Sequence, residues 1–221
     1  MQIAQPKDER LRAPALVLEY ALDSVNHLLT IYNWFQRRRK GGAPRTEEQD
    51  LLRAIVVMAC AGLDACVKLL LKNALKDAVA KNKNARDALR KFVERRLNRG
   101  GDRGAVLATD VLAELLVSPE PWERASRLLL DEFTGRSLQS LEQLKQALAY
   151  LGLSDITLPD GDLKELFKVR NEIVHEMDMD IAHPSRRRRP RKRADMVKYA
   201  KVAVEVANKL VERCDAMLAG G

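Results

Sequence analysis

Three residues with catalytic side chains lie close together in the segment LFKVRNEIVHEMD, residues 166–178. They are Arg170, Asn171 and His175. A histidine that titrates near neutral pH can take the proton of a ribose 2′-hydroxyl, and an arginine can stabilise the charge that builds on an attacked phosphate. An asparagine beside them can orient either group. Together these residue types could cleave a phosphodiester without a metal ion, which makes them the candidate catalytic set.

Arg170 falls in the middle of the apolar stripe of its predicted helix. At 100° per residue the apolar side chains cover roughly 120° of the circumference, and they are Leu163, Leu166, Phe167, Ile173, Val174 and Met177. Because an unpaired guanidinium is costly to bury, its place in the stripe needs a reason. Three reasons are open: an ion pair with Asp64 of the neighbouring apolar helix, a helix that ends near Arg170, or a cleft or subunit interface where the arginine meets an anion.

The spacing of Arg170 and His175 separates them on the helix. Five residues correspond to a rotation of about 140°, so on one straight helix the two side chains should not converge. Two copies related by a dyad could place the arginine of one beside the histidine of the other. That geometry would make a composite site at a symmetric dimer interface.

The net charge of +8 is concentrated in one segment. The stretch RRRRPRKR, residues 186–193, carries seven positive charges, and without them 32 basic residues face 31 acidic ones. A polyanion is the natural partner, nucleic acid before an anionic membrane surface. A solvated loop or a localisation signal is the alternative. The expected RNA-binding residues are Arg186, Arg187, Arg188, Arg189, Arg191, Lys192 and Arg193.

Helical periodicity dominates the chain, and no pattern with a period of two is evident. Helices are expected over about 14–39, 47–80, 85–97, 105–117, 121–133, 137–150 and 194–218, with one more that carries Arg170. A capping box of Thr46 and Gln49 should begin the second helix, which is apolar on most of its circumference. The sequence predicts one all-α bundle over residues 1–221, in which 81–135 could form an inserted helical lobe and 179–193 a basic loop.

Other functional motifs are not found. The chain lacks GxxxxGK[ST], GxSxG and familiar metal-ligand spacings, so no metal or cofactor is expected. The cysteines, Cys60, Cys66 and Cys214, form no CxxC pair and are expected to be reduced core residues. Trp34 and Trp122 are expected to be packing residues rather than platforms on which bases stack.

The sequence favours a cytoplasmic protein without membrane contact. The first residues, MQIAQPKDERLRAP, have no apolar core of the kind that a secretory signal needs. The most apolar run, residues 54–63, is too short to span a bilayer.

The segment RNEIVH resembles the signature of the HEPN superfamily (higher eukaryotes and prokaryotes nucleotide-binding domains), in which an arginine and a polar residue precede a histidine. Here the motif is R-x4-H. The run AIVVMACAGLDACVKLLLKNAL is similar to the second helix of these domains. The run SLQSLEQLKQALAYLGL is similar to the segment before the motif in an RNA-processing and toxin branch. The likeness covers about residues 14–78 and 136–218.

The resemblance implies an all-α homodimer that cleaves RNA without metal, leaving a 2′,3′-cyclic phosphate and a 5′-hydroxyl. Arg170 and His175 would be catalytic and Asn171 would assist them. It also implies a toxin or abortive-infection defence role, beside an antitoxin or another regulatory protein. A tyrosine that one toxin branch carries two residues after the histidine is Met177 here. Some members lack nuclease activity, so the alternative is a non-catalytic nucleic-acid- or nucleotide-binding or dimerisation module.

Overall fold

The computed structural model describes residues 2–39, 42–98, 109, 112–180, 182, 184 and 186–219. Within these residues the regular structure is helical, apart from an isolated antiparallel bridge between Met179 and Arg188. The elements are η1 (Glu9–Leu11), α1 (Arg12–Arg38), α2 (Thr46–Lys81), α3 (Lys83–Leu97), α5 (Pro121–Thr134), α6 (Leu141–Tyr150), α7 (Asp160–Glu176) and α8 (Arg193–Ala219). The predicted all-α bundle is confirmed.

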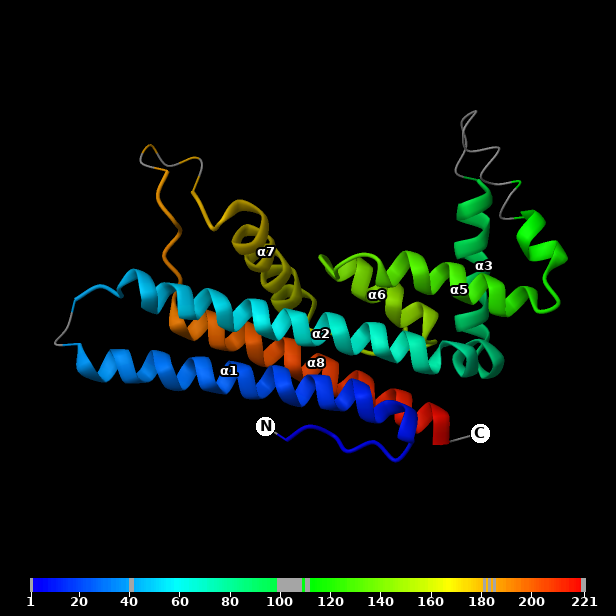
Figure 1. Ribbon diagram of the computed structural model, residues 1–221, viewed down its shortest axis with the longest axis horizontal. Helices are drawn as coiled ribbons and strands as arrows, with labels where there is room; N and C mark the ends of the chain where they lie inside the picture. Colours follow the sequence, from blue (N-terminus) through cyan, green and yellow to red (C-terminus); the bar gives the residue numbers. More distant parts are fainter. Residues whose placement is uncertain are drawn as a thin grey trace.

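The long helix α2 is the centre of the bundle. It runs beside α1 and α8, and the helices α3, α5, α6 and α7 also contact it (Figure 1). An 18-residue window of α2 is long and apolar enough to cross a membrane by composition alone, yet 56% of that window is buried inside the protein. We attribute the hydrophobicity of α2 to its central position, because a helix surrounded by other helices needs apolar side chains on most of its circumference.

A glycine sets the distance between α1 and α2, and a buried glutamate caps the start of α2. A Cβ atom at Gly62 would overlap the Cβ of Ala21, so the two helices approach too closely there for any larger residue. At the start of α2, Glu48 rather than Gln49 is the capping side chain. It is buried, and its Oε2 accepts the backbone N–H of Arg45 at 2.6 Å. The predicted box is therefore shifted by one residue, which leaves Gln49 available for another contact.

The helices α3 and α5, within the predicted lobe 81–135, lie at one end of α2 (Figure 1). Their buried side chains, Ala85, Leu89, Phe92, Ala125 and Leu129, belong to the same hydrophobic cluster as the rest of the bundle. Of the helix predicted near 105–117, residues 112–117 are helical, and residues 105–108, 110 and 111 lie outside the described residues.

The cysteines are buried as predicted, and the two tryptophans are partly exposed. Cys60, Cys66 and Cys214 are buried and free, and burial raises the pKa of each thiol to about 12. Trp34 is 48% exposed and Trp122 is 56% exposed, so neither ring is fully buried, and Trp34 packs edge-on against Phe35. Trp34 belongs to α1 and Trp122 to the first turn of α5, and amphipathic rings of this kind can keep one side in water.

Candidate functional site

The apolar stripe of α7 is buried in one half of the helix and exposed in the other. Leu163, Leu166, Phe167 and Val169 are buried. Val174 is 42% and Met177 66% exposed. Arg170 is half-buried at the transition between the two halves. Because α7 continues to Glu176, a helix end near Arg170 does not explain the position of the guanidinium.

Arg170 and His175 of one chain lie next to each other. Nη1 of Arg170 is 3.2 Å from Nε2 of His175 and donates to Oδ1 of Asn171 at 3.0 Å. The prediction that the arginine and histidine cannot meet on one helix is wrong, because the long arginine side chain reaches along the helix toward the histidine. A guanidinium only donates hydrogen bonds, so a hydrogen bond in this contact requires the lone pair of Nε2 of His175 as its acceptor, which corresponds to the tautomer with the proton on Nδ1.

The expected ion pair between Asp64 and Arg170 is not formed. Asp64 pairs with Lys68 at 2.9 Å and accepts the backbone N–H of Leu138 at 2.9 Å. Within the described residues, no carboxylate lies at ion-pair distance from Arg170. The guanidinium does lie near Cys60 of α2, where its charge opposes the rise that burial causes in the pKa of the thiol. Burial prevails and raises that pKa to about 12, so Cys60 stays protonated and is not a nucleophile.

Asp64 still contributes to the site through the segment that precedes α6. The carboxylate holds the backbone of Leu138, and the carbonyl of the next residue, Gln139, accepts from Nδ2 of Asn171 at 3.1 Å. This bond fixes the orientation of the asparagine amide, so that its oxygen faces Arg170. Asp64 is therefore linked to Arg170 through the backbone of Leu138 and Gln139 and through Asn171, and it is not the counter-ion of Arg170.

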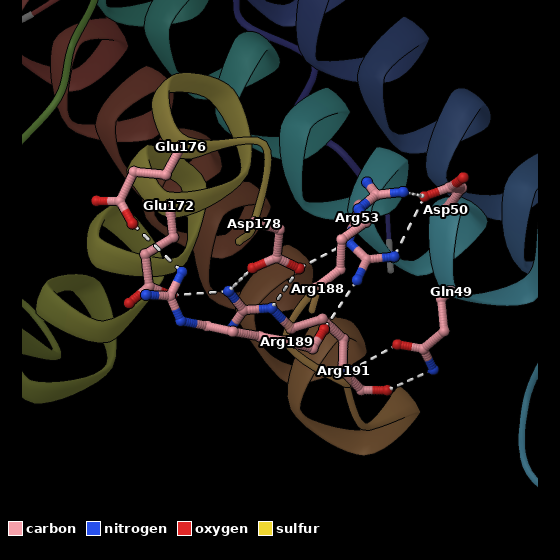
Figure 2. A network of polar contacts seen from close by, with 9 residues as sticks. All are labelled: Gln49, Asp50, Arg53, Glu172, Glu176, Asp178, Arg188, Arg189 and Arg191. Carbon is pink, nitrogen blue, oxygen red and sulfur yellow. Dashed lines mark hydrogen bonds and ion pairs between the residues drawn. The ribbon is translucent and has the colours of Figure 1, made fainter. Parts of the chain in front are cut away.

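The basic segment, residues 186–193, is partly anchored to the protein (Figure 2). Three of its arginines form ion pairs, and these are Arg188–Asp50 at 2.6 Å, Arg189–Glu176 at 3.3 Å and Arg191–Glu172 at 2.7 Å. The other four basic residues are exposed and pair with no carboxylate of the described chain, namely Arg186, Arg187, Lys192 and Arg193. Within the described residues these four are the members of the segment without an ion pair, and for all seven basic residues RNA binding stays a prediction.

Asp178 is a fully buried carboxylate that joins α2, the end of α7 and the basic segment (Figure 2). It accepts from Nε of Arg53 at 2.6 Å and from both Nε and Nη2 of Arg191, which form a bidentate pair. Its backbone carbonyl accepts from the N–H of Arg189 at 2.8 Å. Gln49 completes the joint by exchanging two hydrogen bonds with the backbone of Arg191, at 3.1 and 2.6 Å.

The chain reverses after α7 through two non-glycine residues with positive φ, Met177 at 53° and Asp178 at 59°. The N–H of Asp178 returns to the carbonyl of Glu172 at 2.8 Å, a helix ending that usually employs glycine. Each such residue costs roughly 1–2 kcal/mol. The buried contacts of Asp178 offset this cost. The turn directs the basic segment back to α2 and fixes the end of the helix that carries His175.

The helical bundle and the R-x4-H motif at the edge of its core define a domain of the HEPN superfamily. The chain belongs to the RiboL-PSP-HEPN family, whose model matches residues 21–216. No curated protein and no solved structure gives a significant match. The matched range includes Arg170, Asn171, His175 and Asp178. The chain is thus a HEPN-type module related to nucleic acids.

Proposed function

We propose that this chain is a metal-independent endoribonuclease whose catalytic residues are Arg170 and His175. One observation carries the proposal: a half-buried guanidinium lies 3.2 Å from an exposed imidazole and has no carboxylate partner within the described residues. An arginine that is not neutralised by a carboxylate favours an anion. In RNA the phosphodiester supplies that anion and also brings a 2′-hydroxyl within reach of the histidine.

In the proposed reaction His175 accepts the proton of the ribose 2′-hydroxyl, and the 2′ oxygen attacks the adjacent phosphorus. The bond from phosphorus to the 5′ oxygen breaks as that oxygen takes a proton from a solvent water, and the hydroxide left behind takes the proton from the His175 imidazolium, which yields a 2′,3′-cyclic phosphate and a 5′-hydroxyl. Arg170 must release Nε2 of His175 when the phosphate arrives, because the same lone pair takes the proton. It then stabilises the charge on the phosphorane oxygens, while Asn171 keeps the guanidinium in place.

The test is the cleavage of a labelled structured RNA in excess EDTA. We expect the wild-type protein to produce cyclic-phosphate ends, and Arg170→Ala and His175→Ala each to lower the rate by about 10²–10⁴-fold with an unchanged Tm. His27→Ala removes an exposed histidine of α1 and is the matched control. Cleavage by either site variant at the wild-type rate would contradict the assignment.

We propose that Arg186, Arg187, Lys192 and Arg193 bind the RNA backbone without reading its sequence, because these four cations are exposed and unpaired within the described chain. Replacing all four by alanine should reduce the slope of log affinity against log salt concentration by about 3. The double variant Arg188→Ala, Arg189→Ala should change the slope less, because those charges are already neutralised within the protein. An unchanged slope in the quadruple variant would overturn this assignment.

We infer that the exposed end of α7 mediates a homodimer, since Val174 and Met177 continue a stripe that is otherwise buried. Because Arg170 and His175 meet within one chain, the dimer would bring two complete pairs together rather than build one from two halves. The double variant Val174→Asp, Met177→Asp should be monomeric by light scattering where the wild type is a dimer. A wild-type protein that is monomeric by light scattering would contradict the inference.

We also infer a toxin or defence role in the cytoplasm, because a ribonuclease that acts on its own cell needs restraint by an antitoxin or a similar regulator. Induced expression of the wild-type chain without such a partner should arrest growth, whereas His175→Ala should not. Equal growth of both strains, at equal protein levels, would speak against a toxic nuclease.

One observation favours the second candidate, a non-catalytic RNA-binding module. The lone pair of Nε2 that a general base requires is engaged by Arg170 in this structure. If the pair does not open, the two side chains form a clamp for phosphate and not a catalytic site. RNA that binds to the wild type, binds less to Arg170→Ala and stays intact in both would establish this function instead.

A further inference from the structure

A cavity of about 530 Å³ lies between α2, α3 and α5. Its apolar wall includes Leu75 and Val79 of α2 and Leu130 of α5, and the exposed Trp122 also lines it. This volume is in the range of sites that bind small organic molecules. The cavity is separate from the proposed catalytic pair, because Cys60, which lies near Arg170, and Lys76 at the cavity are about 24 Å apart along α2.

The polar side chains around this cavity are predominantly cationic. They comprise Lys72, Lys76, Arg86 and Arg127, against one lining carboxylate, Glu123. Lys76 forms an ion pair with Glu123. Arg86 is held in place by the carbonyls of Val79 and Ala80, at 3.1 and 2.7 Å. Lys72 and Arg127 form no ion pair within the described residues and are exposed, and the charge of Arg127 acts on Glu123 and on the neighbouring Glu120 without pairing with either. The cavity therefore combines an apolar wall with an excess of positive charge.

This combination selects for one chemical class of ligand. A purely ionic ligand would leave the apolar wall unused, and a neutral apolar ligand would leave the cations unused. We propose that the cavity binds a small amphipathic organic anion. Its apolar body packs on Leu75, Val79 and Trp122, and its carboxylate, sulfonate or phosphate group meets Lys72 and Arg127.

The test uses 8-anilinonaphthalene-1-sulfonate as the probe and the chain of residues 1–221. The variant Trp34→Phe makes Trp122 the only tryptophan, so transfer of its fluorescence to the probe reports binding at the cavity. We expect saturable binding with one site per chain and a rise in Tm. Adding Arg127→Ala should weaken the affinity by about fivefold. Adding Ser126→Phe, which fills the cavity, should abolish transfer.

Arg90→Ala in the same background is the charge-matched control, because Arg90 is an exposed cation of α3 that does not line the cavity. Its affinity for the probe should equal that of the parent. Competition then separates the sources of the ligand: displacement by laurate indicates an aliphatic carboxylate, and displacement by adenosine monophosphate an aromatic phosphate. The proposal is overturned if the folded parent does not bind the probe saturably, or if Arg127→Ala and Ser126→Phe both bind it as the parent does.

Discussion

Arg170 and Arg191 carry the same chemical group close to the same end of α7, and their surroundings differ. Arg191 is 11% exposed and donates to the carboxylates of Asp178 and Glu172. Burial acts to lower the pKa of Arg191, but these hydrogen bonds outweigh it and raise the pKa above its ordinary value. Arg170 instead donates to a neutral amide and lies beside an imidazole. An arginine surrounded by carboxylates holds the fold together, whereas one surrounded by neutral acceptors can still bind an anion.

Removing the buried carboxylate of Asp178 should have the largest effect on the free energy of unfolding. Asp178→Ala leaves Arg53 and Arg191 close together in the interior without their shared acceptor, so we expect a loss of about 3–5 kcal/mol in the free energy of unfolding. Urea denaturation measures it. Asp162→Ala, which removes an exposed partner of Lys198, is the control and should leave stability nearly unchanged. Equal midpoints for the two variants would show that the buried joint is not what stabilises this end of the protein.

The comparison itself can be tested by giving both arginines the same replacement. Arg191→Met leaves Asp178 with Arg53 alone and Glu172 without its partner, so a loss of about 1–3 kcal/mol is expected. Arg170→Met should stay within about 0.5 kcal/mol of the wild type, because no buried carboxylate loses a partner. The RNA cleavage assay should give the opposite order, with Arg170→Met the more damaged variant. Similar losses of stability in Arg191→Met and Arg170→Met would show that the two arginines do not differ in their contribution to the fold.

The smallest effect is expected at Asp64. Asp64→Ala leaves the N–H of Leu138 without its acceptor and removes the pair with Lys68, for a loss of about 1 kcal/mol. Amide hydrogen exchange at Leu138 should become faster. Asp64→Asn, whose amide oxygen can still accept that N–H, should restore most of the protection. Unaltered exchange in the alanine variant would mean that Asp64 does not hold the segment before α6.

The sequence predicts the helices well because each of them depends on local periodicity. The bounds of α1, α2, α3 and α8 lie within a few residues of the expected ranges. The helix expected from residue 137 begins instead at Leu141, because Ser140 caps it through the N–H of Gln143. The residues of the R-x4-H motif are likewise adjacent in sequence and could be singled out without a structure.

The supporting contacts could not be predicted in the same way. Arg53 and Asp178 are 125 residues apart, and a charged residue at the end of a helix is most often solvated. The contact between Arg170 and His175 depends on the reach of one long side chain, which a projection of Cα positions does not contain. The sequence predicts correctly that Asp64 lies on α2. It does not predict that the Asp64 carboxylate accepts the backbone N–H of Leu138.

The bridge between Met179 and Arg188 joins the two ends of the segment between them. The geometry on either side of the bridge therefore does not depend on how long that segment is. The N–H of Asp180 meets the carbonyl of Arg187 at 2.9 Å, and the N–H of Arg189 meets that of Asp178 at 2.8 Å, so the two sides are fastened at their base. Doubling the length of a loop closed in this way costs only about 0.6 kcal/mol. Residues added or removed between positions 180 and 187 should therefore leave His175 and Arg191 where they are.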